Sequence, residues 1–350
     1  MGVIPPERGR FTVRDIFFDH DGLRAIWAIL LFLVLREAIT DIVWTLSGLY
    51  LPQAPAAVDA GQQPAQTSIT PLQLLAGESI GLAGVACATW IMSKIELRPL
   101  RAYGFGGRRS LVYLLAGFTW GIVLLSLLVL GLRASGLLVF DTQLLFGREI
   151  LRYGAIWFGG YILVALFEES FTRGYLQFTL TRGLSGLYRR RFSESRATAC
   201  GFWTAALILS CAFGLGHKSN EGESPIGLVA AGLVGIVLCL SLWRTGSLWW
   251  AIGFHAAWDW AQSFLYGVAN SGSMVQGRLF GTRPTGRPIL SGGLTGPEGS
   301  IFILPIIALT AAVIVLTLPR AHPGYPHSRP DASPDAPEAP RQSHLHLDLP

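Results

Sequence analysis

The chain has 350 residues, of which 51% are hydrophobic and 14% are charged, whereas an ordinary soluble domain carries about 25% charged residues. This balance excludes an ordinary soluble domain and indicates a protein of the lipid bilayer. The net charge of +5 does not indicate nucleic acid binding, because the basic residues lie in short segments between apolar runs, where membrane topology accounts for them.

Eight apolar runs are long enough to cross a bilayer, which requires about 20 mostly apolar residues. They begin near Leu23, Pro71, Ser110, Tyr153, Ala199, Pro225, Ser247 and Gly299. We therefore predict an all-α fold, a polytopic bundle of about eight transmembrane helices within residues 23–318. Residues 1–22 should form a cytoplasmic N-terminal segment. The Pro-rich stretch 319–350 has too few apolar residues to fold, so we expect it to be disordered.

Lysine and arginine residues are concentrated in alternate connections between the runs. The segments before the first run, at 94–109 and at 182–196 are basic, whereas residues 52–70 contain no Lys or Arg. Basic connections stay on the cytoplasmic side. We therefore expect a multi-pass integral membrane protein of a bacterial plasma membrane, with both termini in the cytoplasm.

Charged residues inside the apolar runs are candidates for function, because they are costly in a bilayer unless they are paired. The fourth run contains Glu168 and Glu169, and Arg173 follows four residues after Glu169. This i,i+4 spacing predicts that Glu169 and Arg173 neutralise one another, while Glu168 points about 100° away on the helix and stays unpaired. Glu78 in the second run and Arg36 in the first have no histidine at helical spacing, so we expect structural roles for them.

Only two histidines, His217 and His255, lie in the predicted membrane domain. His217 ends the fifth run, four residues after Phe213. His255 and Asp259 are also four residues apart, so both project from one face of the seventh helix. An isolated histidine in a membrane helix is often a packing residue, but two histidines beside three acids and an arginine on neighbouring helices favour a functional site.

Three motifs in register carry a resemblance to a known family. Glu168–Arg173, Phe213–His217 and His255–Asp259 are similar to the Glu-Glu-x-x-x-Arg, Phe-x-x-x-His and His-x-x-x-Asn/Asp motifs of the CAAX protease and bacteriocin-processing family of intramembrane endopeptidases, which includes the type II CAAX prenyl proteases. The resemblance covers a protease-like core at about residues 150–266 and does not extend to the first three runs or the tail.

The resemblance implies hydrolysis of a peptide bond in a membrane-anchored or lipidated, possibly CAAX-type, protein or peptide. It implies that Glu168, helped by His217, activates a water molecule. His255 and Asp259 would stabilise the oxyanion, and the orienting of His255 is the role we favour for Asp259. Supporting positions are Glu169, Arg173 and Phe213.

Alternatives to metal-free proteolysis stay open at this point. Glu168, His217 and His255 could hold a divalent metal such as zinc with an open position, although the soluble zinc-protease signature His-Glu-x-x-His is absent; we favour no cofactor. Buried acids and histidines also build transporters and proton relays, but the chain shows no inverted repeat. A third reading is a non-catalytic immunity or partner protein on the same fold, which the intact motif residues disfavour.

Overall fold

The structure, a computed structural model, describes residues 13–19, 22–49, 68–220 and 222–319. The predicted disordered tail, apart from Pro319, and most of the predicted N-terminal segment lie outside the described residues.

Each of the eight predicted runs forms a helix, and the predicted all-α class is confirmed. The helices are α2 (Ala25–Ser47), α3 (Pro71–Ile95), α4 (Ser110–Ala134), α5 (Arg148–Glu169), α7 (Glu194–Gly216), α8 (Pro225–Thr245), α9 (Trp249–Trp260) and α11 (Ile303–Thr317). A π-helical segment, η2 (Ser170–Leu176), joins α5 to α6 (Gln177–Tyr188), and a second, η4 (Ala261–Leu265), follows α9. Shorter helical elements are α1 (Arg14–Phe17), η1 (Leu100–Tyr103), η3 (His217–Ser219), α10 (Pro288–Ser291) and η5 (Pro297–Gly299).

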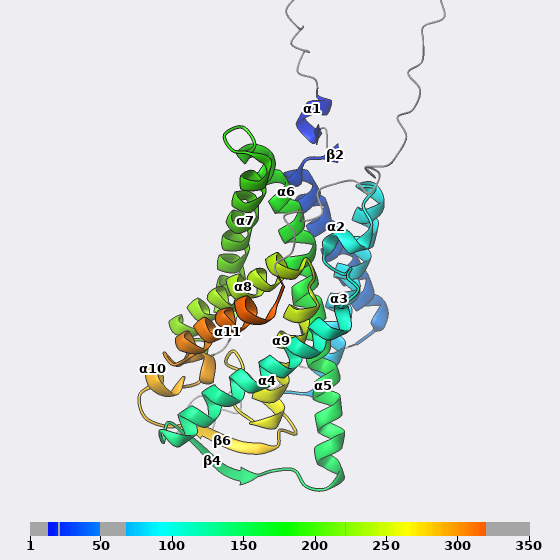
Figure 1. Cartoon of the computed structure of the whole chain (residues 1–350). Coiled ribbons are helices and arrows are strands. Elements are labelled where there is room, and N and C mark those ends of the chain that lie inside the picture. Colours follow the sequence, from blue (N-terminus) through cyan, green and yellow to red (C-terminus); the bar gives the residue numbers. More distant parts are fainter. Residues whose placement is uncertain (1–12, 20–21, 50–67, 221, 320–350) are drawn as a thin grey trace, which may run out of the picture.

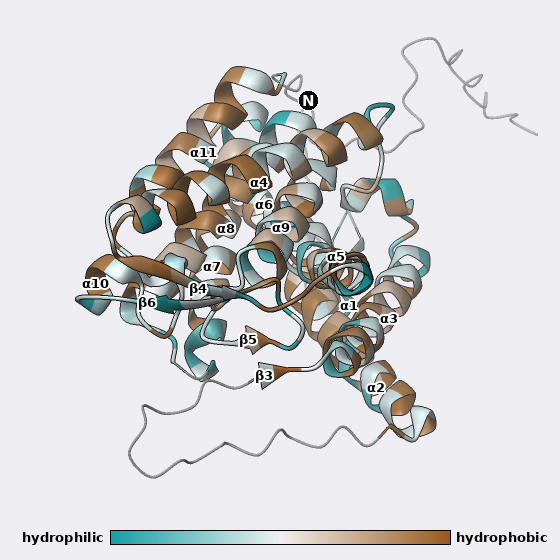
Figure 2. Ribbon diagram, turned by 90° about the horizontal axis from the view of Figure 1, so that it is seen from below, coloured by the Kyte–Doolittle hydropathy of each residue, from teal (hydrophilic) through white to brown (hydrophobic). Residues whose placement is uncertain are grey.

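Five helical stretches are long and apolar enough to cross a membrane, namely Pro71–Ile95, Ser110–Ala134, Arg148–Tyr188, Glu194–Ser219 and Pro225–Thr245. Each of these stretches carries exposed large hydrophobic side chains, such as Trp90, Leu111, Leu151, Leu207 and Val229, as expected for contact with lipid. Figure 2 shows the hydropathy along their ribbons. Helix α2 is also long but carries Arg36, which pairs with Glu37 as expected, and α9 and α11 are shorter. The protein is therefore a polytopic helical membrane bundle, and the number of eight crossings stays a prediction.

The helices are arranged around a central pair. Helices α2 and α3 lie on one side of the bundle, α7, α8 and α11 lie on the other, and α5 and α9 lie between them (Figures 1 and 2). Short two-stranded pairings join distant connections: β4 (Leu138–Gln143) pairs antiparallel with β6 (Phe280–Pro284), β3 (Ser68–Ile69) pairs parallel with β5 (Met274–Val275), and β1 (Phe18–Asp19) pairs antiparallel with β2 (Gly22–Leu23). The first two pairings anchor the long connection between η4 and α11 to the connections before α3 and after α4.

Two of the basic connections meet through a buried ion pair. Arg182 Nη2 lies 2.8 Å from Glu96 Oε1, and the Tyr175 hydroxyl donates to the other oxygen of Glu96 at 3.2 Å. Only residues 189–193 separate α6 from α7, so the predicted connection 182–196 was too long. Arg182 extends the helix and satisfies a buried carboxylate, which explains why its charge is not in a loop.

Helices α4 and α9 approach one another closely because glycines face the contact. A Cβ atom on Gly117 would overlap the carbonyl oxygen of Trp250, and one on Gly253 would overlap the carbonyl oxygen of Leu114. Small residues allow membrane helices to pack backbone to backbone. This contact fixes the position of α9, the helix that carries His255 and Asp259.

We predict that Gly117→Ala lowers the melting temperature of the detergent-solubilised protein and its activity. The added methyl group has to push α4 and α9 apart, and overpacking of this kind costs about 1–3 kcal/mol. Gly131→Ala on the same helix is the matched control, since nothing lies within 4 Å of its added Cβ and alanine is the better helix former. Equal melting temperatures for the two variants would contradict this account of the α4 and α9 contact.

Candidate active site

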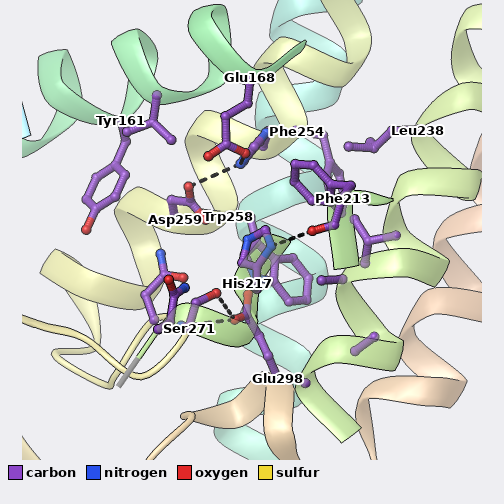
Figure 3. A pocket seen from close by; sticks show the side chains of 18 of the residues that line it. Tyr161, Glu168, Phe213, His217, Leu238, Phe254, Trp258, Asp259, Ser271 and Glu298 are labelled. Carbon is purple, nitrogen blue, oxygen red and sulfur yellow. Dashed lines mark hydrogen bonds and ion pairs between the residues drawn. The ribbon is translucent and has the colours of Figure 1, made fainter. Parts of the chain in front are cut away.

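A cavity of about 300 Å³ lies inside the bundle and is lined by residues from α3, α5, α7, α8, α9, α11 and the connection between η4 and α11. The four residues predicted to be catalytic, Glu168, His217, His255 and Asp259, all line it, as does Phe213. Figure 3 shows side chains from separate helices converging on this space. The four predicted catalytic residues, which are up to 91 positions apart in sequence, therefore share one cavity.

The two adjacent glutamates have different environments. The Glu168 side chain keeps 27% of its accessible surface, whereas Glu169 keeps none. Both lie where α5 passes into the π-helix η2, and the Thr172 hydroxyl donates to the Glu168 carbonyl oxygen at 2.6 Å. Such π-helical turns are frequent at functional sites. Glu168 is therefore the carboxylate that a substrate or water in the cavity can reach.

Glu169 is held by Arg173, as the i,i+4 spacing predicted. Arg173 Nη1 donates to Glu169 Oε1 at 2.9 Å, and both side chains are buried. The Arg173 guanidinium also lies over the Phe213 ring, 4.5 Å from its centroid. Phe213 in turn packs against the His217 ring, with the two centroids 4.8 Å apart. This series of contacts couples the fourth apolar run to the end of α7.

His255 lies among three carboxylates. Its Nδ1 is 2.9 Å from Glu169 Oε1, and its Nε2 is 3.4 Å from Asp259 Oδ2 and 3.8 Å from Glu168 Oε2. Asp259, the residue expected to orient His255, thus contacts its Nε2, and Glu169 makes a second, shorter contact at Nδ1. The sequence did not predict the contact with Glu169, because Glu169 lies on another helix and helical spacing gives no information about contacts between helices.

A hydrogen bond to the backbone shows which ring nitrogen of His217 carries a proton. Its Nδ1 lies 2.8 Å from the Phe213 carbonyl oxygen (Figure 3), and a carbonyl oxygen can only accept, so Nδ1 carries a proton. The Nε2 atom is then left for the cavity that the residue lines.

Two further carboxylates of the cavity, Glu78 and Glu298, were missed as site residues by the sequence reasoning. Glu298 Oε1 accepts from the Trp258 indole at 2.9 Å, and its Oε2 accepts from the backbone N–H and the hydroxyl of Ser271, both at 3.3 Å. Glu78 could have been identified as a candidate site residue from the sequence, because it is a single acidic residue in an apolar run. Glu298 follows a Gly- and Pro-rich loop that carries no helical periodicity, so no local signal identified it.

Glu168, His217 and His255, which would hold a metal ion in the alternative reading, are not arranged as a ligand set. The described residues contain no group of three or more His, Cys, Asp or Glu side chains placed to share a metal ion. Both ring nitrogens of His255 already face carboxylates, at 2.9 Å and 3.4 Å. We therefore derive no step through a metal.

A cavity inside a membrane bundle, lined by a reachable glutamate and two imidazoles, defines an integral membrane protein with the elements of a hydrolytic site. Residues 151–261 match the family model described as Type II CAAX prenyl endopeptidase Rce1-like. No curated protein and no solved structure matches the chain. The match agrees with the family resemblance, and the segment 151–261 that is similar to the Rce1-like model contains the four predicted catalytic residues. At the level of the family, the associated activity is that of a CAAX-type endopeptidase.

We predict that Arg173→Ala destabilises the protein strongly, because it leaves Glu169 as a buried carboxylate without its cation, which costs about 3–5 kcal/mol. Arg152→Ala is the matched control: this arginine pairs with Glu149 at 3.4 Å, but both side chains are exposed, and such pairs contribute at most about 1 kcal/mol. Thermal or denaturant unfolding in detergent measures the loss of stability in each variant. A loss for Arg173→Ala no larger than that for Arg152→Ala would disprove the structural role of the pair.

Glu298, which lies outside the spans, should make the stability depend on pH. Burial raises the pKa of its carboxyl group, the nearby Asp259 charge adds to the rise, and the hydrogen bond from Trp258 opposes it. The folded state thus holds the proton more tightly than the unfolded state, so this group favours folding at low pH and loses that contribution as the pH rises above the ordinary glutamate range.

Glu298→Gln has no such proton to lose. The melting temperature of the variant, relative to the wild type, should therefore increase from about pH 5 to about pH 8. Glu149→Gln, at an exposed position, provides the control for the same change of residue type outside the cavity. A relative melting temperature of Glu298→Gln that falls with pH would show the opposite sign of linkage.

Proposed function

We propose that this protein is an intramembrane endopeptidase that hydrolyses a peptide bond of a membrane-associated substrate. One observation carries the proposal: Glu168 is the accessible member of the glutamate pair and lies in one cavity with His217 and His255. The match to the Rce1-like model supports a CAAX-type activity at the level of the family. The catalytic roles of the individual residues and a lipidated CAAX-type substrate are our proposals.

In the first step, Glu168 acts as the general base. Its carboxylate takes a proton from a water molecule whose second hydrogen is held by Nε2 of His217, and the water oxygen forms a bond to the carbonyl carbon of the peptide. His217 can accept at Nε2 because Nδ1 carries its proton toward Phe213. A positioned base of this kind contributes about 10²–10⁴-fold to a rate.

The second requirement is a donor for the negative charge that develops on the carbonyl oxygen. His255 supplies it from Nε2 when this nitrogen carries a proton, and Glu169 fixes the ring through Nδ1. Asp259, 3.4 Å from Nε2, keeps the ring facing the cavity, since an ionised aspartate can only accept. Collapse of the intermediate breaks the C–N bond, and Glu168 returns its proton to the leaving amine.

The site lies within the bundle, so the substrate has to enter from the membrane or its boundary. We propose a membrane-anchored or lipidated peptide as the substrate class, and a cytoplasmic location for both chain termini based on the basic connections. The cavity is bordered by residues of β3, β5 and η5 as well as by helices. These lining residues support an extramembrane border of the cavity at the long connection between η4 and α11.

Glu168→Gln and His255→Ala should each reduce cleavage by at least about 10²-fold without unfolding the protein. The assay uses purified protein in detergent with a pool of membrane-anchored and prenylated peptides, read by mass spectrometry, with and without a strong chelator. Glu149→Gln, on the exposed face of α5, should cleave like the wild type.

Cleavage by Glu168→Gln at the wild-type rate would disprove the proposed mechanism. Loss of wild-type cleavage with chelator, restored by a divalent metal, would overturn the metal-free form of the mechanism while keeping the protease function.

A further inference from the structure

Glu78 lies in the cavity although it belongs to neither the matched segment nor the family motifs. It is carried by α3 and lines the same space as Glu168, His255 and Asp259, and it interacts electrostatically with all three. Sequence reasoning assigned it a structural role, but no cation is paired with it among the described residues. An ionisable group in a membrane helix that is not paired is a candidate for function.

The hydrogen bonding of Glu78 differs from that of the other acids of the site. Its Oε2 atom is buried and has no hydrogen-bond partner among the described residues. Glu298, in contrast, accepts with both oxygens, and Asp259 lies against His255. A buried carboxylate oxygen without a donor costs free energy, so a donor that arrives with the substrate would recover this cost.

The charges around the cavity indicate which donor would be favoured. The described lining residues include four carboxylates, Glu78, Glu168, Asp259 and Glu298, and two imidazoles, but no Lys or Arg. Arg173 does not line the cavity and is bound to Glu169. A cationic group entering this cavity is attracted by the excess of carboxylates, whereas a carboxylate is repelled.

We propose that Glu78 is a specificity-determining residue that binds a cationic group of the substrate, a Lys or Arg side chain or an amino group, close to the peptide bond that is cleaved. This inference rests on the proposed function and names its substrate class. A charge-assisted hydrogen bond of this kind is stronger than a neutral one.

The test measures a preference ratio on defined peptides. A transmembrane-anchored peptide that the wild type cleaves is taken from the pool, its cleaved bond is mapped, and Lys, Gln or Glu is placed in turn at each position flanking that bond. The values of kcat/KM are compared for wild type, Glu78→Gln, Glu78→Asp and the control Glu149→Gln in the same detergent.

For the wild type, we expect Lys to be preferred over Gln by about tenfold at one flanking position, equivalent to about 1.4 kcal/mol, with Glu the poorest. Glu78→Gln should bring the ratio of Lys to Gln close to one, Glu78→Asp should restore part of it, and Glu149→Gln should keep the wild-type ratio. The ratio is independent of the fraction of folded enzyme, so partial misfolding does not imitate this result.

Equal wild-type rates for the Lys and Gln peptides at every flanking position would overturn the inference while the protease function stands, and so would an unchanged ratio in Glu78→Gln. If Glu78→Gln fails to fold, the wild-type rates on the Lys, Gln and Glu peptides still test whether the site prefers a cationic group. Absence of cleavage of the whole pool by the wild type would instead overturn the proposed function, and this inference with it.

Discussion

The buried ion pair between Arg173 and Glu169 holds the site together. Both side chains are almost fully removed from solvent, where an isolated charge would be costly. The same Glu169 oxygen that binds Arg173 also lies 2.9 Å from His255 Nδ1, and the arginine stacks over Phe213. One pair therefore links α5, α7 and α9, and the orientation of His255 follows from it.

Glu168 is accessible from the cavity, whereas its neighbour Glu169 is buried and paired with Arg173. Successive residues on a helix point about 100° apart, so one carboxylate faces the packed interior and the other faces the cavity. The π-helical segment directly after them changes the direction of the side chains that follow, and the close packing of α4 against α9 sets the opposite wall. Glu168 and both imidazoles thus line one cavity, an arrangement that suits the positioning that catalysis requires.

Residues outside the segment that matches the Rce1-like model also border the cavity. Helix α3 contributes Glu78, and the connection between η4 and α11 contributes Glu298 and Ser271, all outside residues 151–261. These residues border the same cavity as the proposed catalytic residues without belonging to the three motifs. Residues that surround a reaction site can differ between proteins that share one chemistry, and such differences change which substrate is selected.

The sequence by itself determined the all-α class, the eight helical runs and the local pairs, because each depends on hydropathy or on i,i+4 spacing within one helix. The Glu169 and Arg173 pair and the proximity of His255 to Asp259 are of this kind. Only the tertiary structure decided that Glu169 also holds His255, 86 residues away, that Arg182 is buried against Glu96, and that Glu78 and Glu298 face the cavity. Helical periodicity tells which face of a helix a residue occupies, but the packing of helices determines what that face meets.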